Sequence, residues 1–202
     1  MELINDYDSV IEERTGRGYR LNIENYIRRG YDIFIKKPEL FIVYTILLLV
    51  MMPMGGFIIS GPLAAGFFIV AHMIERGRPV VLENFFDGFH YFLQLFLLTI
   101  VTSFLIAVGT MLFILPGIYL SVAYTFSTLF VIFGKMDFWI AMETSRKLIG
   151  REWLSFFGLI VVLVLINILG ALAFGIGLLF TIPVTSCALY AAFDDVVGAA
   201  DI

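Results

Sequence analysis

The sequence predicts an all-α membrane protein with about six transmembrane helices. Composition, long hydrophobic runs and the placement of charges all favour this fold class. Of the 202 residues, 60% are hydrophobic and only 15% are charged, against roughly 45–50% and 25% in ordinary soluble domains. A soluble fold of this size could not cover so much apolar surface with polar groups, so we expect lipid to surround the chain.

Three hydrophobic runs are each long enough for two spans, since one helix needs about 20 apolar residues to cross about 30 Å of hydrocarbon. Helix-disfavouring residues lie near the middle of each run, which predicts three helical hairpins. The breaks are Pro53-Met54-Gly55-Gly56, Leu115-Pro116-Gly117 and Gly175-Ile176-Gly177. The predicted spans are Leu40–Met52, which is short, Phe57–Ile74, Tyr91–Ile114, Ile118–Phe133, Trp153–Phe174 and Leu178–Phe193.

The charged residues predict the orientation of these spans. None of the 13 Lys and Arg residues falls in a predicted hairpin turn. Because basic residues near spans are retained in the cytoplasm, we expect both termini and all charged residues on the cytoplasmic side. Trp139 and Trp153 fall at the same predicted face, where tryptophan anchors helices at the membrane interface. No basic stripe with interleaved aromatic residues occurs, so nucleic-acid binding is not expected.

The segments before the hairpins show helical periodicity with one apolar face. They are Asn22–Lys37, the residues around Phe85 and Phe89, and a helix that Asp137 can cap. The sequence thus predicts a cytoplasmic amphipathic helix at the interface before each hairpin. Two explanations stay open, a threefold internal repeat and the ordinary amphipathic character of cytoplasmic loops.

The chain is predicted to form one membrane domain with two short tails. Residues 1–21 form a cytoplasmic N-terminal tail, residues 22–197 the six-helix membrane domain with its interfacial helices, and residues 198–202 a C-terminal tail. The N-terminal tail is acidic. It docks on a partner or on the basic loops, or else it is flexible.

Reactive chemistry is sparse in this sequence. No ionisable residue falls near the middle of a predicted span, which removes the usual mark of an ion-coupled transporter. His72 and Glu75 share one helix face, but two ligands are too few for a zinc site. His72 and His90 are interpreted as interfacial histidines. The common catalytic motifs are absent, so we predict no catalytic, cofactor-binding or metal-binding residues and do not expect an enzyme.

A few polar and kinked positions inside the spans are candidates for a central site. Asn167 must find a partner, as interhelical contact or as substrate contact. Pro62 and Pro183 lie at comparable depths of two spans, with Gly61 and Thr185 beside them. Paired kinks mark binding sites in some repeat-built transporters. Small residues such as Gly61 also allow tight helix packing, and that alternative stays open.

Several motifs carry a family resemblance from Gly61 to Val197, about two-thirds of the chain. They are Gly61-Pro62-Leu63-Ala64-Ala65-Gly66, Ile114-Leu115-Pro116-Gly117-Ile118-Tyr119-Leu120 and Ala141-Met142-Glu143-Thr144-Ser145-Arg146-Lys147. The chain resembles uncharacterised bacterial polytopic membrane proteins related to the membrane domain of glycerophosphoryl diester phosphodiesterases. The resemblance implies a six-helix bacterial inner-membrane protein. The catalytic domain of those phosphodiesterases is missing, so their activity is not implied.

Two functions follow as hypotheses. The first is a non-catalytic accessory or scaffold subunit that contacts a membrane complex through its cytoplasmic helices, or organises lipid. Its partners would be the lipid bilayer and other membrane-protein subunits. The second is a transporter or channel for a small neutral or lipidic substrate, which the repeated hairpins and the kinked spans support. The first hypothesis is favoured, because the charged residues and the polar helices are all predicted on the cytoplasmic side of the membrane.

Overall fold

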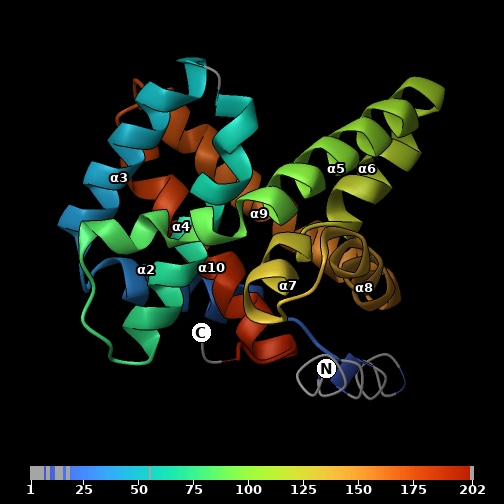
Figure 1. Cartoon of the computed structure of the whole chain (residues 1–202), viewed down its shortest axis with the longest axis horizontal. Coiled ribbons are helices and arrows are strands. Elements are labelled where there is room, and N and C mark those ends of the chain that lie inside the picture. Colours follow the sequence, from blue (N-terminus) through green and yellow to red (C-terminus); the bar gives the residue numbers. More distant parts are fainter. Residues whose placement is uncertain (1–6, 8–9, 12–15, 17–18, 55, 201–202) are drawn as a thin grey trace.

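A computed structural model of the chain describes residues 7, 10–11, 16, 19–54 and 56–200, and Figure 1 shows its architecture. Every regular element among these residues is helical, which confirms the predicted all-α class. Five segments are long and apolar enough to cross a membrane, compatible with a multi-pass membrane protein. They are Ile58–Glu75, Leu82–Leu112, Ile114–Phe133, Trp153–Leu172 and Leu178–Val196, and the shorter Pro38–Met51 is also apolar.

The first hydrophobic run folds into two helices. Helix α3 covers Pro38–Met51, a short 3-10 turn η1 covers Met52–Met54, and α4 covers Gly56–Glu75. Pro38 begins α3, where its missing N–H has no intrahelical partner to lose. These bounds lie within two residues of the predicted spans.

The second run departs from the prediction at its turn. Helix α5 covers Phe92–Leu112, and α6 starts at Ile114, with the extended residue Phe113 between them. The expected break at Leu115-Pro116-Gly117 is therefore wrong, and these residues form the first turn of α6. Proline fits there because the first N–H groups of a helix make no intrahelical bond.

A second break, absent from the prediction, separates α6 (Ile114–Ala123) from α7 (Ser127–Phe133). Ser145 on the following helix bridges it. The Ser145 hydroxyl donates to the Ala123 carbonyl oxygen at 2.7 Å and accepts from the Phe126 N–H at 3.2 Å. One buried side chain thus satisfies two of the backbone groups that the interruption frees.

The third run turns where its glycines predict. Helix α9 covers Trp153–Leu172 and α10 covers Leu178–Val196. Between them, Phe174 has φ 54° and Gly175 has φ 75°. Glycine adopts such left-handed backbone angles without steric cost, which places a turn at this point.

The three segments before the hairpins are helical, but one is not an α-helix. Helix α2 covers Ile23–Phe34, η2 covers Leu82–Tyr91, and α8 covers Phe138–Arg151. The predicted cap of α8 is confirmed, because the Asp137 carboxylate accepts from the Trp139 N–H at 2.7 Å. In contrast, η2 is a 3-10 helix, in which residues three apart lie on one line. Its buried positions Phe85 and Gly88 have this spacing.

Helix α2 packs directly against α10. It turns the buried residues Tyr26, Gly30, Ile33 and Phe34 towards the body of the protein. At Gly30 the two backbones are so close that a Cβ atom would lie 2.6 Å from both the Val184 carbonyl oxygen and the Ala188 nitrogen. The apolar face of α2 is therefore covered by protein.

The segment η2 packs against the middle of α4. A Cβ atom on Gly66 of α4 would overlap the Phe85 carbonyl oxygen, and one on Gly88 would overlap the Pro62 carbonyl oxygen. Figure 1 shows η2 as the green segment that crosses the molecule at mid-height before α5 begins. The chain thus folds back after α4 and returns along it.

Aromatic rings fill the centre where α4, α7 and α10 meet. Phe130 and Phe133 of α7 and Phe193 of α10 are fully buried. The Phe193 ring lies 5.1 Å from that of Phe130 and 5.9 Å from that of Phe133, between ring centroids. Phe126 adds an edge-to-face contact with Phe193 at 5.3 Å. Aromatic pairs with this geometry stabilise a fold by more than the burial of their surface area alone.

Parts of the predicted N-terminal tail pack against this centre. Tyr7 is 5% exposed, and its ring meets Phe130 edge to face. Its hydroxyl donates to the Gly198 carbonyl oxygen at 3.1 Å and accepts from the Ala200 N–H at 3.0 Å. The other predicted tail residues up to position 18, apart from Val10, Ile11 and Gly16, lie outside the described part of the chain, as do positions 201–202.

Candidate functional site

A cluster of charged side chains joins α2 to the ends of α4 and α10. The Arg29 guanidinium donates to Glu75 Oε2 at 2.7 Å and to Asp194 Oδ2 at 2.8 Å, both from the same nitrogen, Nη2. Nε of Arg29 also donates to Glu75 Oε1 at 3.1 Å. This forked geometry is the one for which arginine is suited and lysine is not.

Electrostatics keep the Arg29 guanidinium charged. Burial by itself lowers the pKa of Arg29. The hydrogen bonds that Arg29 donates to Glu75 and Asp194, together with the attraction of these two carboxylates, outweigh burial and raise that pKa above its ordinary value. Beside them, the Tyr26 hydroxyl donates to Asp195 Oδ2 at 2.6 Å. Burial and this bond raise the pKa of Tyr26. The cluster therefore acts as a fixed clamp between three helices.

His72 lies in the aromatic centre, and the interpretation as an interfacial histidine is wrong for it. The side chain is fully buried. Its Nδ1 lies 3.0 Å from the Tyr190 hydroxyl, and its ring centroid lies 5.1 Å from that of Phe133. Glu75 binds Arg29 instead, so the two residues serve different partners. Among the described residues, no group of three or more His, Cys, Asp or Glu side chains could hold a metal ion.

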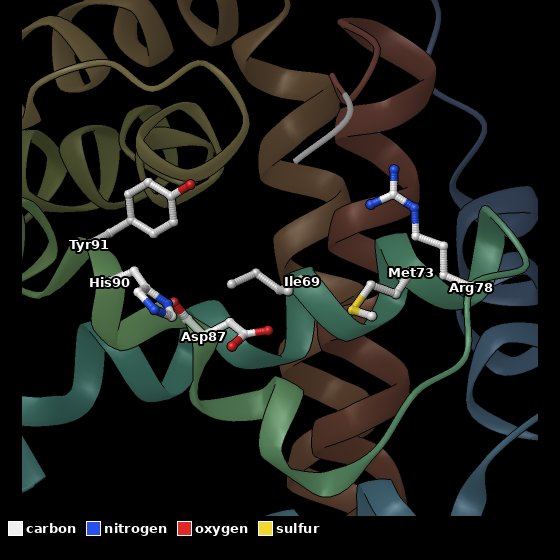
Figure 2. A pocket seen from close by; sticks show the side chains of 6 residues that line it. All are labelled: Ile69, Met73, Arg78, Asp87, His90 and Tyr91. Atoms are coloured by element: carbon white, nitrogen blue, oxygen red, sulfur yellow. The ribbon is translucent and has the colours of Figure 1, made fainter.

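A pocket of about 250 Å³ lies between α4 and η2, and Figure 2 shows the side chains that line it. Ile69 and Met73 come from α4, Arg78 from the loop that follows, and Asp87, His90 and Tyr91 from η2. The pocket thus combines a cation, a carboxylate, an imidazole and a phenol with an apolar floor. Pockets for small ligands have this mixture of apolar walls and a few placed polar groups.

Hydrogen bonds fix two of the polar groups in this pocket. The Asn84 side-chain amide donates to Asp87 Oδ2 at 3.1 Å. Nδ1 of His90 lies 3.0 Å from the Asp87 carbonyl oxygen. A carbonyl oxygen can only accept a hydrogen bond, so the Nδ1 atom of His90 carries the proton in this contact. Both side chains are thus held in place by η2 itself.

Sequence reasoning did not find this pocket. Arg78 and Asp87 lie in a loop and in a short helix, where charged residues ordinarily face solvent. The one local signal was the run of Phe85, Phe86 and Phe89 among polar residues. Only the return of η2 along α4 brings Arg78 and Asp87 to the same cavity as Ile69 and Met73.

A second cavity, of about 170 Å³, lies at the break between α6 and α7. Hydroxyl groups dominate its lining, with Thr99, Thr102, Ser121, Tyr124, Ser127 and Thr128 beside Leu98 and Ile106. Thr99 and Thr102 donate to carbonyl oxygens of their own helix at 2.8 and 2.7 Å. Ser127 is 1% exposed, and its Oγ has no hydrogen-bond partner among the described residues.

The predicted central residues lie along two different seams. A Cβ atom on Gly61 would come within 2.9 Å of the Leu95 carbonyl oxygen of α5, and Pro62 packs against Gly88 of η2. Asn167 of α9 donates to Thr185 Oγ1 of α10 at 3.0 Å, and Pro183 is buried in α10 two residues before Thr185. None of these five residues lines the two cavities above. Their role as a substrate site stays a prediction.

The two predicted anchors differ in their surroundings. Trp139 on α8 is 60% exposed. Trp153 at the start of α9 donates from Nε1 to the Tyr119 carbonyl oxygen at 3.3 Å and stacks on the Tyr119 ring. An exposed and a half-buried indole of this kind both fit an interface position.

Comparison with known proteins adds no relative. No protein-family model matches the chain, and searches of curated proteins and of solved structures find no match either.

Proposed function

We propose that the protein is a non-catalytic integral membrane protein, an accessory or scaffold subunit that holds a membrane complex together. The observation that carries this proposal is the filled centre. Phe126, Phe130, Phe133 and Phe193 are fully buried and pack ring against ring where α4, α7 and α10 meet. Dense aromatic packing of this kind stiffens a bundle, whereas a path for solutes needs space or mobile side chains.

The clamp at Arg29 supports the same role. Its charges are used to tie α2 to α4 and α10, and α2 itself is closely packed on α10 at Gly30. The outer face of α2 presents Tyr31, which is 54% exposed, and α8 presents the exposed Trp139. Exposed aromatic residues on otherwise polar helices are typical anchors of protein interfaces.

The proposal includes a topology. Six crossings form three hairpins, with α3 as the short sixth span. Helices α2 and α8 precede the first and third hairpins at the cytoplasmic interface, whereas η2, which leads into the second, packs against the middle of α4. Both termini are cytoplasmic, in a bacterial inner membrane. In Figure 1, α2 and the C-terminal ends of α4 and α10 lie in the lower half, while the tip of the α5–α6 pair lies at the upper right, which supports this arrangement. Membership of the group related to the phosphodiesterase membrane domain belongs to the same proposal.

Photo-crosslinking in intact cells tests the partner. A photoreactive amino acid replaces Tyr31 or Trp139, and a matched control carries it at Leu172, 74% exposed at the end of α9. We expect Tyr31 and Trp139 to give one crosslinked species of defined mass, which native mass spectrometry of the complex in mild detergent then reproduces at fixed stoichiometry. A lone chain in detergent, with the same crosslinks from all three positions, contradicts the proposal.

The hydroxyl-lined cavity favours a second function, a transporter or channel for a small neutral or lipidic substrate. Broken helices beside polar cavities are found where membrane proteins bind solutes. Ser127→Cys in a Cys187→Ala background separates the two functions by its reaction with a small water-soluble thiol reagent in intact membranes. The scaffold proposal expects no labelling, because Ser127 is buried. Rapid labelling supports a water-filled path and the second function.

A further inference from the structure

We propose that the pocket between α4 and η2 binds the headgroup of a phospholipid with a primary amine, of the phosphatidylethanolamine class. Such a headgroup carries a phosphate and an ammonium group a few atoms apart. The pocket offers a guanidinium in Arg78 and a carboxylate in Asp87, with His90 beside it. This site is independent of any partner subunit.

The charges match the two halves of the headgroup. Arginine binds phosphate oxygens through several N–H donors at once. The Asp87 carboxylate is held by the bond from Asn84 and accepts hydrogen bonds from an ammonium group, which has three donors. In Figure 2, the Asp87 and Arg78 side chains lie on opposite sides of Met73, and both line the same pocket. His90 closes the other end.

The size of the pocket fits a headgroup and not a whole lipid. Its volume of about 250 Å³ lies below the roughly 300–1,000 Å³ of pockets that bury drug-sized molecules. The acyl chains must therefore lie outside it, on an apolar surface next to the pocket.

Such a surface begins beside the pocket. Phe89, Phe92 and Phe96 stack in sequence, with ring centroids 6.4 and 5.7 Å apart and ring planes within 11°. The series starts next to His90 and continues along α5. Leu93, 63% exposed, lies on the same first turn. Acyl chains lying along α5 would keep the headgroup at the pocket.

Calorimetric titration of the full-length protein in mild detergent tests the site. The probes are dioctanoyl phosphatidylethanolamine, the phosphatidylcholine and phosphatidylglycerol with the same chains, and soluble phosphoethanolamine. We expect the ethanolamine lipid to bind about tenfold more tightly than the choline lipid, whose quaternary nitrogen has no N–H to donate. Phosphoethanolamine alone should bind at least about tenfold more weakly than the lipid, because it lacks apolar chains.

Variants assign the two charges. Arg78→Gln should weaken binding of all three lipids about tenfold, and Asp87→Asn should abolish only the preference for ethanolamine over choline and glycerol. Arg151→Gln and Glu83→Gln remove exposed charges elsewhere and should bind like the unchanged protein. Circular dichroism and gel-filtration volume check the fold, and Arg78→Lys, which keeps the charge, should retain part of the affinity.

Three results overturn the inference. Lipid binding that Arg78→Gln and Asp87→Asn leave unchanged places the headgroup elsewhere. Equal affinity for all three lipids shows nonspecific binding of chains. Phosphoethanolamine that binds as tightly as its lipid assigns the pocket to a soluble phosphorylated amine.

Discussion

Gly66→Ala is expected to lower the stability of the protein by about 3 kcal/mol, at the upper end of the usual cost of overpacking. The added Cβ would overlap the Phe85 carbonyl oxygen and lie 3.0 Å from the Tyr44 hydroxyl. The overlapping atom belongs to the backbone, so no side-chain rotation relieves the clash. Helix α4 and η2 must move apart, and the pocket between them opens.

Thermal unfolding in mild detergent, followed by circular dichroism and by gel filtration after heating, measures this loss. For a chain of this length, about 3 kcal/mol corresponds to a fall of roughly 6–12 °C in Tm. Gly158→Ala is the matched control, because its Cβ would meet only the Ile23 side chain at 3.8 Å within the same kind of apolar helix. Equal melting temperatures for the two variants would show that η2 is not seated on α4 as described.

Arg29→Met is expected to cost about 2–3 kcal/mol, because it removes the cation and keeps most of the side-chain volume. Glu75 and Asp194 each bind the same Arg29 nitrogen, at 2.7 and 2.8 Å. Without it two carboxylates face one another with no cation between them. The figure is below that for fully buried pairs, since about a quarter of each side chain is exposed to solvent.

The same melting experiment, with Arg28→Met as its control, measures this prediction. Arg28 is exposed and adjacent on α2. Neutralising the two acids by Glu75→Gln and Asp194→Asn in the Arg29→Met background should recover part of the lost stability. If Arg29→Met and Arg28→Met melt together, the clamp contributes nothing to the fold.

Local features of the sequence predict much of this fold. The apolar runs predict the helices, Asp137 predicts the start of α8, and Gly175 predicts the turn before α10. Each of these signals acts within one turn of the residue that carries it. They succeed because an N-cap bond and a left-handed glycine depend on the chain beside them and little on distant packing.

The features that escaped prediction depend on contacts between distant segments. Ser145 holds the break between α6 and α7 from a different helix. The pocket at Arg78 and Asp87 exists because Gly66 lets η2 approach α4. His72 is buried because α7 and α10 cover it, although its position near the end of α4 indicates an exposed place. No periodicity within one segment encodes these arrangements.

The bonds of Tyr7 have a consequence for how the chain matures. Its hydroxyl meets Gly198 and Ala200, residues made more than 190 positions later. During synthesis Tyr7 can bind these partners only after residues 198–200 have been made, although chains otherwise tend to fold from the N-terminal side as they appear. Until then Phe130 lacks the ring that meets it edge to face in the folded protein, so this part of the aromatic centre is completed late.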